Sequence, residues 1–327
     1  MPCHTAAVTH APHETSRSIV DVMILDTASL YYRSFYALPS SMTAPDGSPH
    51  GAIRGLLQTV ERLRERFHPG TLIAAWDNDW RPDWRVELLA SYKTHRLADP
   101  TQDGEDEPDD LGPQIGAIHE ILTAWGIPVI GMEGFEADDV AGTLSHLAAK
   151  GALSTVLVTG DRDFVQLVDE TTSVLLTVKG GMDAWPLLDT EAVIERFGVS
   201  PAQYLDVAAL RGDPSDGLPG VPGIGDKTAV RLIQQFGDLA GVQRACRNNP
   251  LVKPLTPRLA GLVTDHAEYL AIAKKVSTIR TDVPVSEAQD LLRLPIPHSP
   301  VELRAWDVVV DDWGVRRFAE SAMNAAS

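Results

Sequence analysis

The sequence predicts an α/β protein with a mostly parallel central sheet, followed by a smaller α-helical domain. Two observations support this prediction. From residue 19 to about 185, short and almost continuous apolar runs alternate with longer helical stretches, and strands without a polar face are typical of a parallel sheet covered on both sides. Beyond about residue 185 helical patterns alone continue, which indicates a second, helical part.

The predicted elements follow in order along the chain. Residues 1–18 are predicted to form a disordered tail. Apolar runs of strand length lie at 19–26, 71–77, 127–131, 155–161 and 174–178, and helical stretches lie between them at 51–67, 115–125 and 138–149. In the second part, helices are predicted near 190–197, 201–211, 226–236 and 258–276, and segments rich in glycine and proline interrupt them at 212–226 and 248–257.

The composition narrows the class of protein. With 327 residues, 44% of them apolar, the chain suits one large domain or two and can bury a core, which excludes a disordered chain. Its 45 acidic and 28 basic residues give a net charge of −17; this argues at first sight against a nucleic-acid partner, although it does not say where the charges lie. Two cysteines, no secretory signal and no bilayer-spanning apolar run predict a cytoplasmic protein without membrane contact.

Several carboxylates follow the predicted strands. In an open parallel sheet, the crevice beyond the carboxyl ends of the strands is where ligands bind, so acids from different strands are expected to converge there. Asp161 and Asp163 are two residues apart, and in extended geometry they would point to the same face. Helix capping would explain one or two of the acids at 136–139, but not all three. The full candidate set is Asp26, Asp77, Glu136, Asp138, Asp139, Asp161, Asp163, Asp213 and Asp216.

So many carboxylates in one crevice could not all stay ionised without counter-charge. Hard divalent cations with oxygen ligands supply it, so the sequence predicts two or more Mg²⁺ or Mn²⁺ ions. Zinc is not expected, because the histidines and cysteines lack ligand spacing. A carboxylate-only site favours metal-assisted phosphoryl transfer over acyl transfer.

A second pattern predicts a phosphate-binding hairpin at 217–229, where four glycines and two prolines precede a helix that begins near Asp226. Glycines allow close approach of a phosphate, and amides at a helix start attract anions. An ordinary loop and helix cap would look similar. However, residues 217–280 contain nine basic and four acidic residues, a charge that fits a helix–hairpin–helix holding a duplex backbone. The candidate contacts are Gly220, Gly223, Gly225, Lys227 and Thr228.

A second basic group lies at 81–96. We predict that Arg85, Lys93 and Arg96 share one broad helical side with Tyr92 beside them, an arrangement that suits a passing strand through phosphate contacts and stacking. A solvated helix face is the alternative. The next segment, 99–110, has seven acids, two prolines and no apolar residue, and is predicted to be a solvent-exposed loop.

Taken together, the ordered motifs resemble the bacterial 5′-nuclease family, which includes the 5′→3′ exonuclease domain of DNA polymerase I, its stand-alone relatives and the flap endonucleases. The matching segments are LDTASLYYRSFYALP (25–39), AAWD (74–77), WRVELLASYKTHR (84–96), GFEADDVAGTL (134–144), VTGDRDFVQLV (158–168) and RGDPSDGLPGVPGIGDKTA (211–229). The resemblance implies a PIN-like core at 19–185 with an arch or clamp at about 80–112. It further implies a helix-3-turn-helix domain at 186–290 and a C-terminal extension at 291–327 packed on the core.

The resemblance also implies an activity. The family cuts DNA at 5′ flaps, nicks and 5′ ends of duplexes in replication and repair, and RNA primers are a further possible substrate. The nine carboxylates above match its metal ligands, and Arg33, Arg85 and Lys93 match positions that engage the scissile phosphate or its neighbour. A K⁺ ion in the helix-3-turn-helix and a monomeric state are also expected. A PIN-type ribonuclease and a non-catalytic branched-DNA-binding protein remain alternatives.

Overall fold

The computed structural model describes residues 20–99, 104–248 and 251–325. The predicted tail, residues 100–103 of the acidic segment 99–110 (from here on the acidic stretch) and part of the 248–257 segment lie outside these residues. Among the described residues, no helix has both the length and the apolar character that a bilayer crossing requires.

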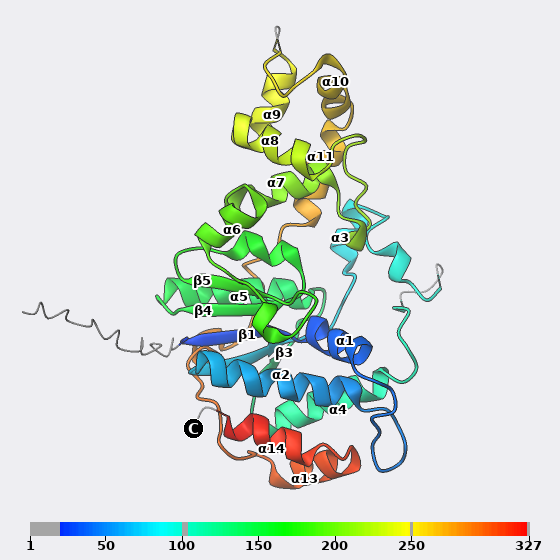
Figure 1. The fold of residues 1–327 in the computed structure, drawn as a ribbon, viewed down its shortest axis with the longest axis vertical. Coiled ribbons are helices and arrows are strands. Elements are labelled where there is room, and N and C mark those ends of the chain that lie inside the picture. The colour runs from blue at the N-terminus through cyan, green and yellow to red at the C-terminus, as the bar shows by residue number, and fades with distance from the viewer. Residues whose placement is uncertain (1–19, 100–103, 249–250, 326–327) are drawn as a thin grey trace, which may run out of the picture.

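The core is a six-stranded sheet with the strand order β3-β2-β1-β4-β5-β6 (Figure 1). Five strands are parallel: β1 (Val22–Asp26), β2 (Thr71–Ala75), β3 (Val129–Ile130), β4 (Thr155–Thr159) and β5 (Thr172–Leu176). The short β6 (Leu187–Leu188) is antiparallel to β5. The chain builds β1, β2 and β3 outward on one side and then crosses back to place β4 on the other side of β1. This reversal puts a topological switch point, the usual ligand site of such sheets, at the ends of β1 and β4.

Helices cover both faces of the sheet because each central strand is apolar on both sides. Met23 and Leu25 of β1 face a layer that contains α2 (Gly51–Phe67) and α4 (Gly112–Trp125). Val22 and Ile24 face α5 (Ala137–Lys150) on the other side. The predicted fold class, a mostly parallel α/β sheet domain followed by a helical domain, is confirmed.

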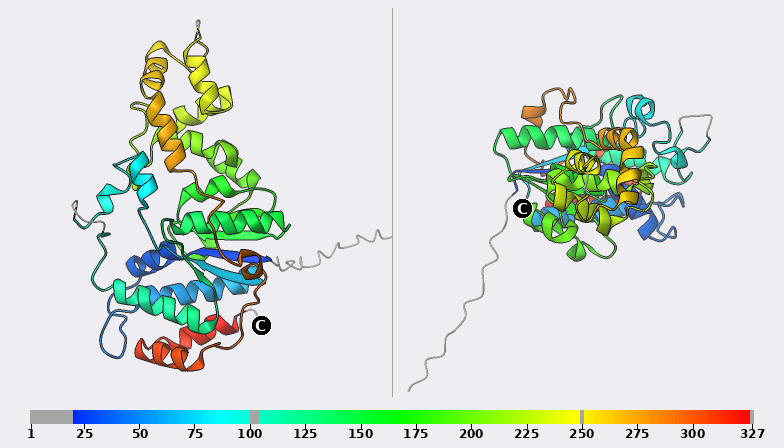
Figure 2. Two further views of the ribbon diagram at one scale, coloured as in Figure 1. Left: turned by 180° about the vertical axis from the view of Figure 1, so that it is seen from behind. Right: turned by 90° about the horizontal axis from the view of Figure 1, so that it is seen from above.

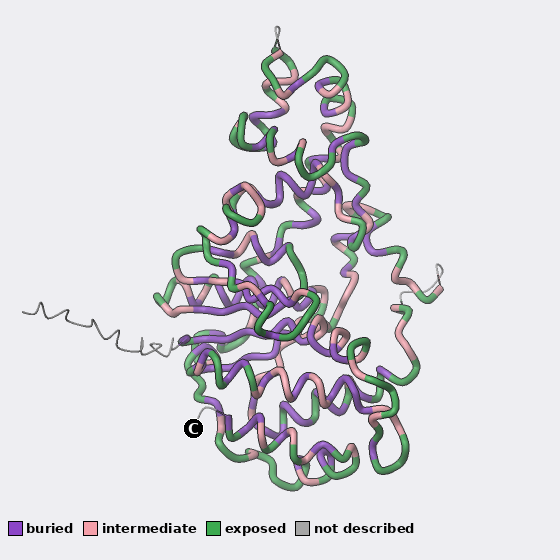
Figure 3. Tube along the Cα trace, viewed as in Figure 1, coloured by how far each residue is buried: buried purple, intermediate pink, exposed green. Residues whose placement is uncertain are grey.

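The helical domain has its own core and lies above the sheet in Figures 1 and 2. Its helices are α6 (Thr190–Phe197), α7 (Pro201–Arg211), α8 (Asp226–Phe236), α9 (Leu239–Cys246), α10 (Pro257–Asp265) and α11 (Ala267–Val276). The single helix predicted at 258–276 is therefore two, with a break at His266. Figure 3 shows buried segments in both the sheet domain and this domain.

The C-terminal segment returns to the sheet domain. After the short α12 (Ala288–Leu291), α13 (Leu303–Asp312) packs against α4, and α14 (Arg316–Asn324) packs against α2. The buried Arg64 side chain donates hydrogen bonds of 2.6 Å to the carbonyl oxygens of Ala322 and Met323, which fixes the end of α14 on the core.

The segment 81–96 differs from the prediction of one helical side. Helix α3 spans only Asp83–Leu88, and Leu89 leaves it in an extended conformation. Lys93 then adopts a left-handed backbone with φ of 49°, and its N–H donates to the Asp216 carbonyl. Arg85, Lys93 and Arg96 are therefore on separate pieces of backbone, because contacts with the carboxylates and the 213–217 turn override the local helical pattern.

Candidate active site

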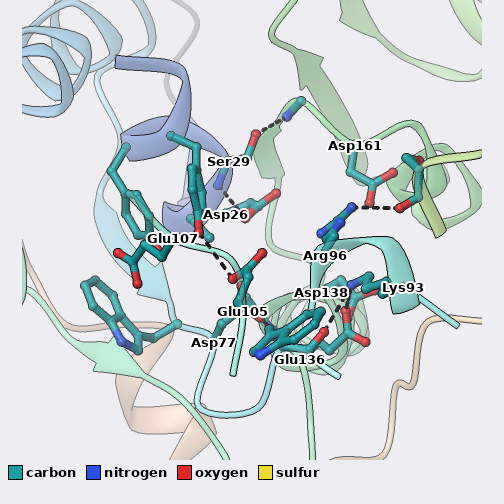
Figure 4. A pocket seen from close by; sticks show the side chains of 18 of the residues that line it. Asp26, Ser29, Asp77, Lys93, Arg96, Glu105, Glu107, Glu136, Asp138 and Asp161 are labelled. Atoms are coloured by element: carbon teal, nitrogen blue, oxygen red, sulfur yellow. Dashed lines mark hydrogen bonds and ion pairs between the residues drawn. The ribbon is translucent and has the colours of Figure 1, made fainter. Parts of the chain in front are cut away.

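A cavity of about 660 Å³ opens at the carboxyl ends of β1, β2 and β4, at the topological switch point. We refer to it as the crevice (Figure 4). Strand ends, the start of α5 and the turn after α7 all contribute to its lining. Of the nine predicted carboxylates, six line it: Asp26, Asp77, Glu136, Asp138, Asp161 and Asp213.

Two of these acids end adjacent strands and are held by local hydrogen bonds. Asp26 ends β1 and caps α1 (Thr27–Ala37) by accepting from the Ser29 N–H, and the Thr159 hydroxyl donates to it at 2.6 Å. Asp77 follows β2 and accepts from the Ala137 N–H at 2.7 Å, at the first residue of α5. The sheet register therefore brings these two carboxylates together, as the strand-end pattern predicts.

The acids at 136–139 divide into two roles. Glu136 and Asp139 form a reciprocal capping box at the start of α5. Asp139 is fully buried and also accepts from the Arg85 guanidinium and the Arg280 N–H, each at 2.8 Å. Only Glu136 and Asp138 of this group line the crevice, so Asp139 is occupied by protein contacts behind it.

Asp161 and Asp163 do not lie on an extended strand, so the prediction that they share one face of extended backbone is wrong. The chain after β4 turns at once into a 3₁₀ helix, Arg162–Leu167, and Asp161 caps it by accepting from the Asp163 N–H at 2.8 Å. Asp161 is exposed to solvent in the crevice, whereas Asp163 is buried behind it. One oxygen of Asp163 is shielded from solvent and has no hydrogen-bond partner among the described residues.

The turn after α7 supplies the last two acids. Asp213 caps the 3₁₀ helix Pro214–Asp216 and lines the crevice, and Asp216 is buried next to it. Burial raises the pKa of Asp216 and of Asp26 to about 7. Burial, followed by the charge of Asp161, raises the pKa of Asp163 well above its usual range. These carboxylates hold protons more tightly than free acids do, which is the behaviour expected of a cluster without enough counter-charge.

Fixed cations balance one side of the cluster. The Arg85 guanidinium is almost fully buried and lies 2.8 Å from Glu136 and 3.5 Å from Asp138. The Lys93 ammonium forms an ion pair with Glu136. Against the effect of burial, Lys93 and Arg85 lower the pKa of Glu136.

Tyr92 does not lie where a stacking residue would have to be. It is only 2% exposed, and its hydroxyl donates to Glu136 at 2.8 Å. The predicted role in DNA stacking is therefore wrong, because the ring is inside the protein and orients a carboxylate.

Two other predicted contacts lie at different distances from the crevice. Arg33 is outside its lining: the guanidinium donates to the carbonyl oxygens of Val178 and Gly180 and lies over the Trp185 ring. Arg96 lines the crevice and donates to the Ser215 carbonyl at 3.0 Å, 3.8 Å from Asp216.

The predicted hairpin forms a turn before α8, and its residues differ in exposure. Gly223, Gly225 and Lys227 are exposed, and Thr228 is half-buried in the first turn of α8. Gly220 is buried, and its N–H donates to the Tyr269 hydroxyl at 2.8 Å. A Cβ at Gly220 would lie 2.4 Å from the Arg211 backbone. Gly220 therefore permits close backbone packing, and its predicted phosphate contact is wrong.

Sequence reasoning missed two glutamates of the acidic stretch. Glu105 and Glu107 are half-buried and line the crevice, together with Tyr31 and Tyr32 of α1. The prediction that 99–110 is simply an exposed loop is wrong for these two residues. The sequence did contain a signal for this. Glu105 and Glu107 are two residues apart, with the exposed Asp106 between them, and alternate residues of an extended segment share a face.

The crevice has the donor chemistry for hard cations. Its carboxylates supply only oxygen ligands, and the buried Asp163 oxygen lacks a partner. Within the described part of the chain, however, no three acidic, histidine or cysteine side chains already surround one point closely enough to hold an ion. The donor set fits a divalent metal.

Comparison with known proteins gives matches over almost the whole chain. Residues 21–198 match the family model of the 5′-3′ exonuclease N-terminal resolvase-like domain, and residues 199–299 match that of the 5′-3′ exonuclease C-terminal SAM fold. The junction falls in the connection between α6 and α7.

Two relatives of similar length come from bacteria. A 5′-3′ exonuclease of Streptomyces coelicolor is 46% identical over 90% of this chain and 96% of its own. One of Mycobacterium tuberculosis is 40% identical over 84% and 88%. DNA polymerase I of Mycobacterium leprae is 37% identical over 84% of this chain but only 28% of its own length.

Solved structures share the fold at lower identity. The T5 5′-exonuclease with bound zinc ions has a TM-score of 0.61 at 18% identity, covering 94% of this chain and 100% of that one. The catalytic core of Rad2 in complex with a DNA substrate has a TM-score of 0.57 at 15% identity, covering 94% and 92%.

Proposed function

Because the chain belongs to the 5′-3′ exonuclease family, we propose that it is a structure-selective 5′ nuclease that hydrolyses DNA phosphodiesters with divalent metal ions. Its substrates would be 5′ flaps, nicks and 5′ ends of duplexes, with RNA primers as a further substrate. The single observation that carries the proposal is the convergence of six carboxylates from separate parts of the chain on one crevice at the switch point.

Mg²⁺ or Mn²⁺ ions would be held by the crevice carboxylates, with Asp163 and Asp216 behind Asp161 and Asp213. Bound there, they would activate water and stabilise the charge of the leaving oxygen. Asp139 would contribute by fixing Arg85, to which it is already hydrogen-bonded.

Basic residues in the crevice lining, together with Arg85 buried behind it, would orient the reacting phosphate. Arg85 and Lys93 stand beside Glu136 and hold its ionised form. If bound cations neutralised the carboxylates, these two side chains would become available to a phosphate oxygen. Arg96 lies at the edge of the same cavity and would contact the neighbouring phosphate. Arg33 would join only after releasing the carbonyls of Val178 and Gly180.

The hairpin would bind the duplex part of the substrate, at a distance from the bond that is cut. Its exposed Gly223, Gly225 and Lys227 at the start of α8 offer backbone amides and a cation without a base-reading side chain. A K⁺ ion at this turn, which the family resemblance implies, is part of the proposal and is tested by replacing KCl with LiCl in binding assays. A monomer would suffice, since crevice and hairpin belong to one chain.

A product map on a 5′-labelled double-flap DNA, with and without Mg²⁺ or Mn²⁺, tests the proposal. We expect short labelled products from the flap end that require the metal. A matched substrate with an RNA flap separates this activity from that of a PIN-type ribonuclease, which would cut the RNA flap faster. Binding without any metal-dependent product would indicate a non-catalytic branched-DNA-binding protein and would reject the proposal.

A further inference from the structure

The acidic stretch is the one prominent sequence motif that the proposed function does not use. Its position is set by backbone pairing. Leu97 and Glu105 form an antiparallel bridge, the Ala98 N–H donates to the Gly104 carbonyl at 2.9 Å, and the Asp106 N–H donates to the Arg96 carbonyl at 2.7 Å. The backbone of residues 104–106 is therefore tied to the segment that carries the crevice cation Arg96.

This pairing turns two glutamates into the crevice. The Tyr32 hydroxyl donates to the Glu105 carboxylate at 3.2 Å, and one Glu107 oxygen is shielded from solvent without a hydrogen-bond partner among the described residues. Figure 4 shows both glutamates on the side of helix α1, away from Lys93 in that view. We call Glu105 and Glu107 the acidic wall.

The acidic wall differs from Glu136, the carboxylate that caps the start of α5, in its lack of an ion pair. Glu136 has Arg85 and Lys93 within ion-pair distance. Neither wall glutamate has an ion pair with any described residue, and the cations of the crevice lining are Lys93, Arg96 and Arg162. A negative group that approaches on this side meets two uncompensated charges, and such repulsion in a partly desolvated cavity is stronger than in bulk water.

We propose that the acidic wall selects the 5′ terminus of the substrate by charge, disfavouring a terminal phosphate and favouring a terminal hydroxyl when that terminus lies inside the crevice. A phosphate monoester carries close to two negative charges at neutral pH, whereas a hydroxyl carries none. On a nick or a one-nucleotide flap, the terminus is next to the cleaved bond and meets the wall. On a long flap it lies far beyond the screening distance. The inference rests on the proposed nuclease function.

The test is single-turnover cleavage by the full chain of one-nucleotide and 20-nucleotide flaps, each with a 5′-phosphate or a 5′-hydroxyl and a label on the 3′ side. We expect the wild type to cut the short hydroxyl flap about tenfold faster than the short phosphate flap, and to cut the two long flaps equally. Glu105→Gln with Glu107→Gln should remove most of this difference. The glutamine at 105 can still accept from Tyr32, and thermal unfolding of the variant verifies that it folds.

A matched control is Asp106→Asn with Asp109→Asn, which removes the same charge from exposed positions of the same stretch and should keep the terminus preference. The inference is overturned if the wild type shows no preference between the two short flaps, or if the glutamine variant keeps that preference. It is also overturned if the variant cuts all four substrates more slowly by the same factor, because the glutamates would then maintain the structure of the site rather than select the terminus. Failure of the nuclease proposal is distinguishable, since the wild type would then cut neither long flap in any metal.

Discussion

The crevice and the hairpin are both charged, but the charges are arranged in opposite ways. In and directly behind the crevice, acids from distant parts of the chain come together, most of them partly or fully buried. Burial disfavours their ionised form and raises the pKa of Asp26 and of Asp216. In the hairpin, Lys227 is exposed at the start of α8 next to an equally exposed turn. Buried and mutually perturbed groups are typical of chemistry, whereas exposed cations with backbone amides are typical of sequence-independent phosphate binding.

This difference also explains the net charge of −17. The acids gather where cations would neutralise them, and the region from 217 to 280 is basic. An acidic total is therefore compatible with a DNA partner, because location decides the interaction. The comparison predicts that changes in the crevice alter rate and stability, and that changes in the hairpin alter affinity alone.

The largest effect is expected from Asp161→Asn. Asp161 is the exposed crevice acid at the end of β4, and removing its charge should slow flap cleavage at least about a hundredfold with little change in DNA affinity. Single-turnover rates and a binding titration in Ca²⁺ measure the two separately. Asp312→Asn, at the exposed end of α13, is the charge-matched control. A normal rate for Asp161→Asn would refute its assignment to the metal site.

Arg85→Met should lower the free energy of unfolding by about 3 kcal/mol, because it leaves buried carboxylates without their cation. Chemical denaturation at neutral pH without metal measures the change. Arg280→Met is the matched control: its side chain pairs with the exposed Asp282, so the loss should stay below about 1 kcal/mol. Equal losses of unfolding free energy in the two variants would contradict the view that buried cations of the protein itself stabilise the carboxylates at the crevice.

The stability of the metal-free protein should fall as pH rises. Asp26 and Asp216 have pKa values of about 7 in the folded state, above the roughly 4 of an unfolded chain. Between these values the folded protein binds more protons, so each step up in pH favours unfolding. Thermal unfolding from pH 5 to pH 8 should show a falling midpoint in EDTA and a flatter one in Mg²⁺. In EDTA, the unfolding midpoint of the Asp26→Asn variant should fall less over this pH range. An unchanged fall would contradict the assignment of the pH dependence to Asp26.

The smallest effect is expected from Lys227→Ala. Loss of one phosphate contact should weaken duplex binding several-fold, equally for unrelated sequences, and reduce the salt slope by about 1. Fluorescence anisotropy at several KCl concentrations measures both quantities. Lys150→Ala, at the exposed end of α5, should change neither. If Lys227→Ala behaves like this control, the hairpin does not hold the duplex.

Sequence patterns predicted the elements whose formation depends on the periodicity of neighbouring residues. The apolar runs located the central strands, and the helix at 51–67 has the predicted ends because its apolar face repeats with helical periodicity. The strand-end acids Asp26 and Asp77 converge because parallel strands share one carboxyl edge.

Tertiary contacts decided the rest. The helix expected at 81–96 is broken at Leu89, because Arg85 pairs with Asp139 at the start of α5 while the Lys93 N–H is fixed on the Asp216 carbonyl of the 213–217 turn. Tyr92 is buried because its hydroxyl meets Glu136, more than forty residues away. Glu105 lies in the crevice because its backbone pairs with Leu97. The alternation of Glu105 and Glu107 shows which residues share a face, but no periodic pattern shows which distant segment they meet.

The central claim, that the crevice carboxylates bind the divalent ions of a nuclease, is tested most directly by anomalous diffraction from crystals grown with Mn²⁺. We predict anomalous peaks inside the crevice, within bonding distance of carboxylate oxygens drawn from Asp26, Asp77, Asp138 and Asp161. Mn²⁺ peaks found only at surface sites, with the crevice empty at saturating concentration, would contradict the claim.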